Sequence, residues 1–235
     1  MHTDYTSVVS QLAELVAGLE REETATEPAL HTLMDAGVRN VAGSQYAGIT
    51  LAERGRAVVN VAATHRYPKL LDTIQNDCGE GPCLESAWRH CVMHIDDLDA
   101  DRRWPRYRQF ALERTPIRSI LSYELFVDGH AMAALNFYAE QPRAFGDDSI
   151  HLGGVFAAHT ALAWSVMRRQ DQFRSALASR DTIGQAKGVI MERFDLDAVE
   201  AFDLLTRLSQ QSNKKVVDIA QALIESEHPL KRRRD

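Results

Sequence analysis

The sequence predicts an α+β protein: an antiparallel sheet flanked by helices, then a long connector helix and an all-α bundle. Three observations support this prediction. Two pairs of short, β-branched segments lie within the first 140 residues. About fifty residues separate the two pairs, which is too many for a simple meander. From about residue 147 onward the hydrophobic pattern becomes helical and stays helical.

Two amphipathic helices are expected before the sheet. Apolar residues at helical spacing predict the first helix over residues 4–20. The polar segment 21–28 ends in proline and should separate it from a second helix over about residues 28–42. Packing within the protein explains the apolar faces of both helices. Alternatively, part of the first helix could form a dimer face.

Two hairpins predict the sheet. Residues 46–53 and 57–65 are short, β-branched segments joined by a polar turn. Residues 118–129 and 130–140 form the second pair, turning at Asp128-Gly129, a dipeptide typical of tight hairpin turns. The long connection between the hairpins should cover one face of the sheet, where it could enclose a pocket.

A heptad seam can be traced along the predicted long helix, with alternating steps of four and three residues. About forty residues of helix would span ~60 Å, which is typical of a connector between two domains. The polar members of the seam indicate a partner helix whose pairing is marginal, and a histidine facing its mate in a dimer would make that pairing sensitive to pH. The seam runs through Val155, His159, Leu162, Val166, Arg169, Phe173, Ala176, Arg180 and Ile183.

Two further helices are expected. Asp197, with Glu200 three residues later, has the spacing of a capping box at the start of a helix over 197–211. Ser212 or Asn213 is expected to cap the last helix. The apolar face of the first of these helices is predicted to consist of Val199, Phe202, Leu205 and Leu208, and that of the second of Val216, Ile219, Ala220 and Leu223.

The composition is that of an ordinary globular protein, with 45% hydrophobic and 26% charged residues among 235. A net charge of −6 argues against a protein uniformly coated for nucleic acid. The charge is divided: residues 166–235 carry 13 basic and 11 acidic side chains, and the first 165 carry 14 and 22. No segment resembles a signal peptide, and no stretch approaches the ~18 apolar residues of a membrane helix. We therefore expect a cytoplasmic protein with no membrane partner.

Cysteine usage and motif searches give no sign of catalysis. The sequence has three cysteines, Cys78, Cys83 and Cys91, and this odd number indicates the reducing interior of a cell. Their spacing is not that of a metal site, even with His90 and His94 nearby. Their plain interpretation is as small buried hydrophobic side chains. The sequence contains no P-loop, no H-E-x-x-H and no G-x-S-x-G motif. We expect no catalytic residue, no metal and no cofactor.

One stretch of the predicted long helix is unusual. Gly184 and Gly188 share a helical stripe, and each costs about 1 kcal/mol relative to alanine. They leave a bare strip that another backbone can approach, bordered by Lys187, a flexible cation suited to phosphate. Gln185 could donate to or accept from a base edge. The plain alternative is that the glycines admit a neighbouring helix and that Lys187 is an ordinary exposed lysine.

The last 55 residues resemble an ANTAR domain, a three-helix RNA-binding module. The residues that carry this resemblance are Ile183, the QAKG string at 185–188, Met191, Ala201, Phe202, Leu205, Ser209, Asn213 and Ala220. The portion from about 25 to 165 resembles a GAF domain, an antiparallel α/β sensor fold. Its carrying strings lie at 71–86, 102–107, 118–126 and 134–145.

These resemblances imply an RNA-binding antitermination regulator rather than an enzyme. ANTAR proteins bind paired hairpins in nascent transcripts and stabilise an antiterminator against a terminator, so a homodimer would place two ANTAR units on two loops. The residues expected to contact RNA are Arg180, Gln185, Lys187, Gly188, Asn213, Lys214 and Lys215. GAF domains often bind a small ligand or mediate dimerisation, and the side chains expected to line such a pocket are Trp104, Tyr123, Phe126 and Asn136.

The expected organisation has five parts: an N-terminal amphipathic helix (1–24), a GAF-like sensor (25–165), a connector helix continuous with the helices on either side (166–179), an ANTAR bundle (180–228) and a basic tail (229–235). Two other functions remain open. One is a ligand-sensing or protein-interaction module whose helical tail only oligomerises. The other is a GAF-fold free methionine sulfoxide reductase, which needs one thiolate to attack sulfur and a second thiol to resolve it. The motif around Cys83 does not match that family's pattern.

Overall fold

The computed structural model describes residues 10, 12–14, 17–18, 26–53, 57–86, 92–128 and 131–227. The chain divides into two compact units, Met1–Met167 and Arg168–Asp235. The predicted helix over 4–20, the turn at Gly129, Cys91 and the basic tail lie wholly or mostly outside the described residues. Leu12, from the first of these, is buried in the core of the first unit.

The first unit is built on a five-stranded antiparallel sheet in the order β2-β1-β5-β4-β3. Both predicted hairpins are confirmed as β1–β2 and β4–β5, and β5 lies at the centre because it also pairs with β1. The short strand β3 was not predicted, since three residues are too few for an alternating pattern to be recognised. The strands are β1 (Tyr46–Glu53), β2 (Val59–Ala63), β3 (Met93–Ile95), β4 (Ser119–Asp128) and β5 (Ala131–Ala139).

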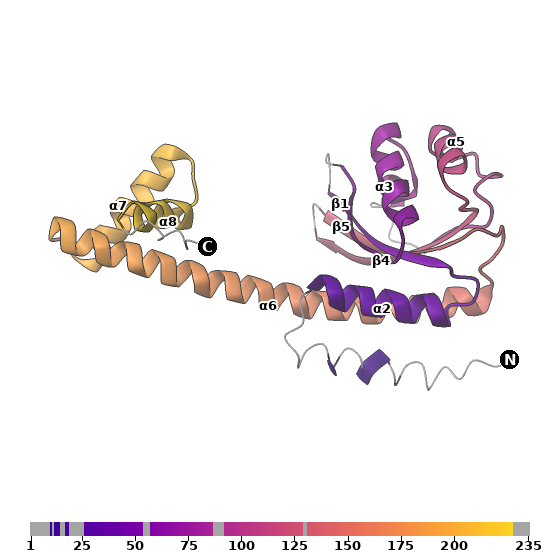
Figure 1. Cartoon of the computed structure of the whole chain (residues 1–235), viewed down its shortest axis with the longest axis horizontal. Coiled ribbons are helices and arrows are strands. Elements are labelled where there is room, and N and C mark those ends of the chain that lie inside the picture. The colour runs from indigo at the N-terminus through magenta and orange to yellow at the C-terminus, as the bar shows by residue number, and fades with distance from the viewer. Residues whose placement is uncertain are drawn as a thin grey trace, which may run out of the picture. The chain divides into compact units, whose positions relative to one another are not determined.

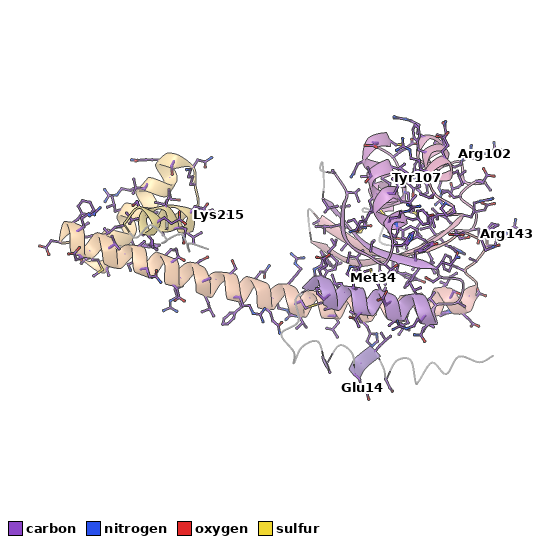
Figure 2. All side chains as sticks on the ribbon, viewed as in Figure 1. Glu14, Met34, Arg102, Tyr107, Arg143 and Lys215 are labelled. Atoms are coloured by element: carbon purple, nitrogen blue, oxygen red, sulfur yellow. The ribbon has the colours of Figure 1, made fainter. Side chains whose placement is uncertain are left out.

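Helices cover both faces of this sheet (Figure 1). Helix α2 (Thr26–Asn40) and the first part of α6 (Asp147–Phe194) cover one face. The other face is covered by α3 (Arg66–Cys78), α4 (Pro82–Ser86) and α5 (Pro105–Arg114), so the long connection covers one face as predicted. A hydrophobic core lies on each face of the sheet, and Figure 2 labels one fully buried side chain from each: Met34 on α2 and Tyr107 on α5. The α+β class is therefore confirmed.

Close packing between α2 and the sheet explains a glycine in the first core. A Cβ added at Gly37 would lie 2.8 Å from Cε1 of Phe137, a fully buried ring on β5. Phe156, on α6, is the next neighbour of that position at 3.5 Å. The absence of a side chain at Gly37 therefore allows α2 to approach the sheet.

The second unit contains the last turns of α6, then α7 (Ala198–Ser212) and α8 (Val216–Glu227). The predicted capping box at the start of α7 is confirmed. The Asp197 carboxylate accepts from the backbone N–H groups of Val199 and Glu200, and the Glu200 carboxylate accepts from the Asp197 N–H. The buried core of this unit is small and consists of Ala186, Ile190, Ala201, Leu205 and Ala220.

One prediction about this unit is wrong, and another holds only in part. Asn213 does not cap the last helix; it ends α7 in the left-handed conformation (φ 52°), which asparagine tolerates, and the Ser212 hydroxyl donates back to the Leu208 carbonyl. The predicted apolar face of α7 is also only partly buried. Leu205 is in the core, but Val199, Phe202 and Leu208 are 69%, 42% and 42% exposed, because the partner helices are too few to cover them. The apolar face predicted for the last helix does pack on this core.

The predicted long helix is confirmed as α6, and residues 166–179, predicted as a connector continuous with the helices on either side, lie within it. By length and composition alone, α6 also contains a stretch apolar enough to cross a membrane. This differs from the expectation that no stretch approaches that character. However, 44% of the stretch is buried in the structure, and a single helix of this kind is weak evidence for a membrane span.

Candidate functional site

The glycine strip on α6 is open. A Cβ added at Gly184 or at Gly188 would meet no atom within 4 Å, and neither glycine has a positive φ. Packing among the described residues therefore does not require glycine at either position, and backbone conformation does not require it either. Two glycines in a helix cost about 1 kcal/mol each relative to alanine. Two exposed glycines without a structural need suit a surface that another molecule approaches closely.

Charged and apolar side chains border the strip. Arg180, Gly184, Lys187 and Met191 follow one another at steps of four, three and four, so they form one stripe along α6. Arg180 is exposed, Met191 is 36% exposed and Lys187 is half-buried. Gln185 is exposed as well, but it lies two positions before Lys187, which places it about 160° around the helix axis. The structure therefore brings Arg180 and Lys187 to one face and leaves Gln185 on another.

Lys187 reaches across to the neighbouring helix. Its Nζ lies 5.8 Å from the centroid of the Phe202 ring on α7. Ala186 and Ile190, one and three positions away on α6, are buried in the small core. The Lys187 stem thus runs along the edge of that core while its ammonium lies beside an exposed aromatic ring. Phe202 was predicted only as part of the apolar face of α7. The signal for its exposure is that α7 carries more apolar residues than are needed for one stripe that packs on the core.

The remaining predicted RNA contacts lie in the turn between α7 and α8. Asn213, Lys214 and Lys215 are all exposed, and Figure 2 labels Lys215 on the small unit. The turn is ordered by a reciprocal pair of hydrogen bonds, in which the Lys214 N–H donates to the Ser209 carbonyl and the Ser209 hydroxyl donates to the Lys214 carbonyl. The Lys215 carbonyl accepts from the N–H groups in the first turn of α8. Both lysines therefore precede α8, next to its positive dipole end.

The four side chains predicted to line one ligand pocket do not meet. Trp104 and Asn136 lie on the face covered by α3 and α5, whereas Tyr123 and Phe126 lie on the α2 and α6 face. The Tyr123 hydroxyl donates to the Ile150 carbonyl at 2.6 Å, and Phe126 packs edge-on against Trp164. The prediction of a shared pocket is wrong. A bulge between Glu124 and Phe126 shifts the alternation along β4, which the sequence pattern does not show.

A buried polar network lies instead between α3 and the sheet. The carboxylate of Asp72, which is 2% exposed, accepts from Thr50 Oγ1 (3.0 Å), Asn60 Nδ2 (2.9 Å) and Gln75 Nε2 (3.2 Å). Asn136 Nδ2 in turn donates to Thr50 Oγ1 at 3.0 Å. Burial raises the pKa of Asp72 to about 6, although the three hydrogen bonds act to lower it. Of this network only Asn136 was predicted; Asp72 and Gln75, three residues apart among the apolar residues of α3, were the available signal.

Two surface depressions occur among the described parts of this unit. One, of about 340 Å³, lies between the β4 residues around Tyr123 and the small side chains of α6 from Gly154 to Ala161. The other, of about 210 Å³, lies beside Trp104 and the loop at Gly79–Gly81. The depressions do not include the Asp72 network, so the polar network and the surface hollows are separate features.

The described cysteines are poorly suited to redox chemistry. Cys78 and Cys83 are both buried free thiols. Burial raises the pKa of Cys83 to about 12, and its backbone N–H is held by Gln75 Oε1 at 2.7 Å. A thiol that resists ionisation is a poor nucleophile at neutral pH. Among the residues that the structure describes, no cluster of three possible metal ligands is found.

The predicted dimer seam on α6 is partly open. Leu162 and Phe173 are 54% and 66% exposed, and Leu177 is 46% exposed, although all three are large apolar side chains. Val155 and Val166 are half-buried. His159 is half-buried too, and its Nδ1 lies 2.9 Å from the Val155 carbonyl oxygen, one turn earlier.

Comparison with protein families assigns both units. The model of the GAF domain matches residues 24–165, more than half of the chain, and the model of the ANTAR domain matches residues 171–224. The chain belongs to the GAF domain family and carries an ANTAR domain. The ANTAR domain indicates an RNA-binding antitermination regulator, and the GAF domain indicates a sensor. Both are regulatory rather than catalytic domains.

Solved structures agree on the fold of the GAF unit. The GAF domain of a phosphoenolpyruvate-protein phosphotransferase from Coxiella burnetii is 14% identical with a TM-score of 0.53, and the alignment covers 71% of this chain and 96% of that chain. The corresponding domain from Acinetobacter is 12% identical with a TM-score of 0.53, covering 70% and 95%. The free methionine-R-sulfoxide reductase from Neisseria meningitidis is 17% identical with a TM-score of 0.51, covering 72% and 96%. At these identities the likeness concerns the fold alone. Comparison with curated proteins found no match.

Proposed function

We propose that this chain is a cytoplasmic antitermination regulator that binds two hairpins of a nascent transcript at once. The ANTAR unit contacts the hairpin loops, a homodimer supplies two such units, and the GAF unit acts as sensor and dimerisation platform. The observation that carries the proposal is the open strip at Gly184 and Gly188, bordered by Lys187, within the segment that matches the ANTAR domain. In this proposal the sensor spans 25–165, the connector 166–179 and the RNA-binding unit 180–228.

The strip suits an RNA loop because the sugar-phosphate backbone can approach a helix closely only where side chains are short. Lys187 and Arg180, on the same stripe, then lie within reach of phosphates. The exposed Lys214 and Lys215 offer two more phosphate contacts at the start of α8. A handful of phosphate contacts gives an affinity that falls steeply with salt.

Dimerisation compensates for this small footprint. Residues 166–235, which include the basic tail, carry a net charge of only +2, so one ANTAR unit is poorly equipped for tight binding, whereas two linked units gain from effective concentration. The exposed apolar side chains on α6, Leu162, Phe173 and Leu177, provide a surface for the second copy. Because the seam also contains arginine and histidine, its pairing would be marginal, and a signal received by the GAF unit could shift it.

The proposal is tested by selection and titration. Full-length protein is used to enrich a pool of RNAs that carry two short hairpins with randomised loops, since the chain does not reveal the loop sequence. The enriched RNA is then titrated at two salt concentrations, with and without its second hairpin. We expect at least a tenfold weaker affinity for one hairpin, consistent with an effective concentration gain of about 10²-fold or more for two linked sites.

Three variants accompany the titration. Lys187→Ala should weaken binding and reduce its salt dependence, and Gly188→Ala should weaken binding although it favours the helix. Lys69→Ala removes an exposed lysine from α3 of the GAF unit and serves as the matched control. If the helical tail only oligomerises, no RNA is enriched, or the bound RNA is equally indifferent to all three changes.

A further inference from the structure

Phe202 is an exposed aromatic ring on a helix that also carries fully buried residues. Ala201 and Leu205 on the same helix are 0% exposed, whereas Phe202 is 42% exposed. Val199, one turn earlier on the same stripe, is 69% exposed. The ring therefore lies outside the small core of this unit and, together with Val199, leaves apolar surface that is available to a binding partner.

The cation beside this ring indicates what covers it. The Nζ of Lys187 lies 5.8 Å from the ring centroid, near the outer limit of about 6 Å for a cation–π contact. The contact orders the lysine side chain, yet at that distance it does not cover the ring. Lysine is depleted in the centre of protein–protein interfaces, so a half-buried lysine in the middle of the patch disfavours a protein partner.

An aromatic ring next to an ammonium group matches the two parts of one unpaired nucleotide. Single-stranded loops are recognised by stacking splayed bases on aromatic side chains, while a lysine neutralises the adjoining phosphate. The glycine strip lies immediately beside Lys187, so the nucleotide backbone has room to approach the same place. The ring, the cation and the bare strip are thus contiguous on α6 and α7.

We propose that Phe202 and Lys187 form a binding site for a single unpaired nucleotide of the RNA loop, with its base stacked on the Phe202 ring and its phosphate on Lys187. This inference rests on the proposed RNA-binding function and adds a stacking residue on α7 to the contacts expected on α6. It assigns the two side chains different roles: Phe202 supplies affinity that does not depend on salt, and Lys187 supplies affinity that does.

The first measurement compares variants at position 202 in the titration against enriched two-hairpin RNA. Phe202→Leu should weaken binding about 5- to 100-fold, the range for loss of one stacked base, whereas Phe202→Trp should retain it because every aromatic ring offers a stacking face. Leu208→Ala is the matched control, since Leu208 has the same 42% exposure on another face of α7. Thermal unfolding of each variant establishes that the bundle remains folded.

The second measurement separates the roles of the two residues. The slope of log affinity against log salt should fall by about 0.7 in Lys187→Ala and stay unchanged in Phe202→Leu. An RNA series with one abasic loop nucleotide at a time should contain one member for which Phe202→Leu has no further effect. That member identifies the stacked base.

The outcomes distinguish the two proposals. If the wild-type protein enriches and binds two-hairpin RNA, and Phe202→Leu binds as well as wild type, the nucleotide site is wrong and the antitermination proposal stands. A change in oligomeric state of Phe202→Leu without RNA, measured by sedimentation, would show that the ring belongs to a protein interface and would also overturn the site. If wild type binds no RNA, both proposals fail together.

Discussion

The two units of this chain differ in how completely they bury their own apolar side chains. In the GAF unit, large residues from both sheet faces are fully enclosed, and a buried carboxylate accepts three side-chain hydrogen bonds. In the ANTAR unit the core is small, while large apolar side chains such as Phe194 (57%) and Val199 (69%) are exposed. The first unit encloses a large apolar core, whereas the second encloses a small one and leaves apolar surface available to another molecule.

Glycines show the same contrast. Gly37 and Gly48 lie where elements pack closely, and an added Cβ would come within 2.8 Å of Phe137 in one case and 2.7 Å of Pro68 in the other. Gly184 and Gly188 face open space. One residue type therefore admits neighbours of the same chain in the GAF unit and, in our account, admits RNA in the ANTAR unit.

The largest expected effect comes from removing a core leucine from the ANTAR unit, which should lower the stability of that unit alone. Leu205→Ala deletes a fully buried side chain, which costs about 2–5 kcal/mol, a large part of the stability of so small a domain. All three tryptophans (88, 104 and 164) belong to the GAF unit. We expect the helical signal of the bundle to melt early while the tryptophan fluorescence transition stays in place. A parallel fall in both transitions would contradict independent units.

The second prediction concerns the buried carboxylate of the GAF unit. Because the pKa of Asp72 is raised from 3.8 to about 6, the folded state holds the proton more tightly than the unfolded state. Stability contributed by this group is therefore present at low pH and is lost as pH rises from about 4 to 6, by about 3 kcal/mol at most. Asp72→Asn should flatten this dependence while staying close to wild type at pH 7, because Asn60 Oδ1 has no hydrogen-bond partner and can accept from the new amide.

Tryptophan fluorescence in urea, measured at half-unit pH steps, checks this prediction. Other carboxylates also titrate, so the relevant quantity is the difference between wild type and Asp72→Asn. A constant difference across pH 4 to 6 would mean that Asp72 does not have a raised pKa.

The same substitution should have opposite effects at the two kinds of glycine. Gly37→Ala forces a methyl group against Phe137 and should destabilise the GAF unit by about 1–3 kcal/mol. Gly184→Ala adds a methyl group in open space and should stabilise the second unit by about 1 kcal/mol. Thermal unfolding of both variants is the measurement, and destabilisation by Gly184→Ala would show that the strip is packed rather than open.

The smallest expected effect is at the start of α7. Asp197→Ala removes the acceptor for two backbone N–H groups and should cost the ANTAR unit about 1 kcal/mol without changing the GAF unit. Asp197→Asn, which keeps an acceptor oxygen, should restore most of that loss. Equal losses in the two variants would mean that the charge matters more than the hydrogen bonds.

Regular patterns made much of the fold predictable from sequence. The hairpins, α6 and the capping box at Asp197 depend on local periodicity and spacing, and each was found. The three-residue strand β3 and the bulge in β4 depend on pairing with distant residues, so local patterns do not reveal them. For the same reason the pocket residues were assigned to one site although they lie on two faces. The role of Phe202 required knowing which apolar residues the small core could bury.

Single-round transcription tests the central claim most directly. The template carries an enriched two-hairpin sequence ahead of an intrinsic terminator, and the fraction of full-length transcript is measured with increasing full-length protein. We expect read-through to rise with the wild-type protein, to require both hairpins, and not to rise with Gly188→Ala. Unchanged termination at protein concentrations that saturate the RNA would contradict the claim.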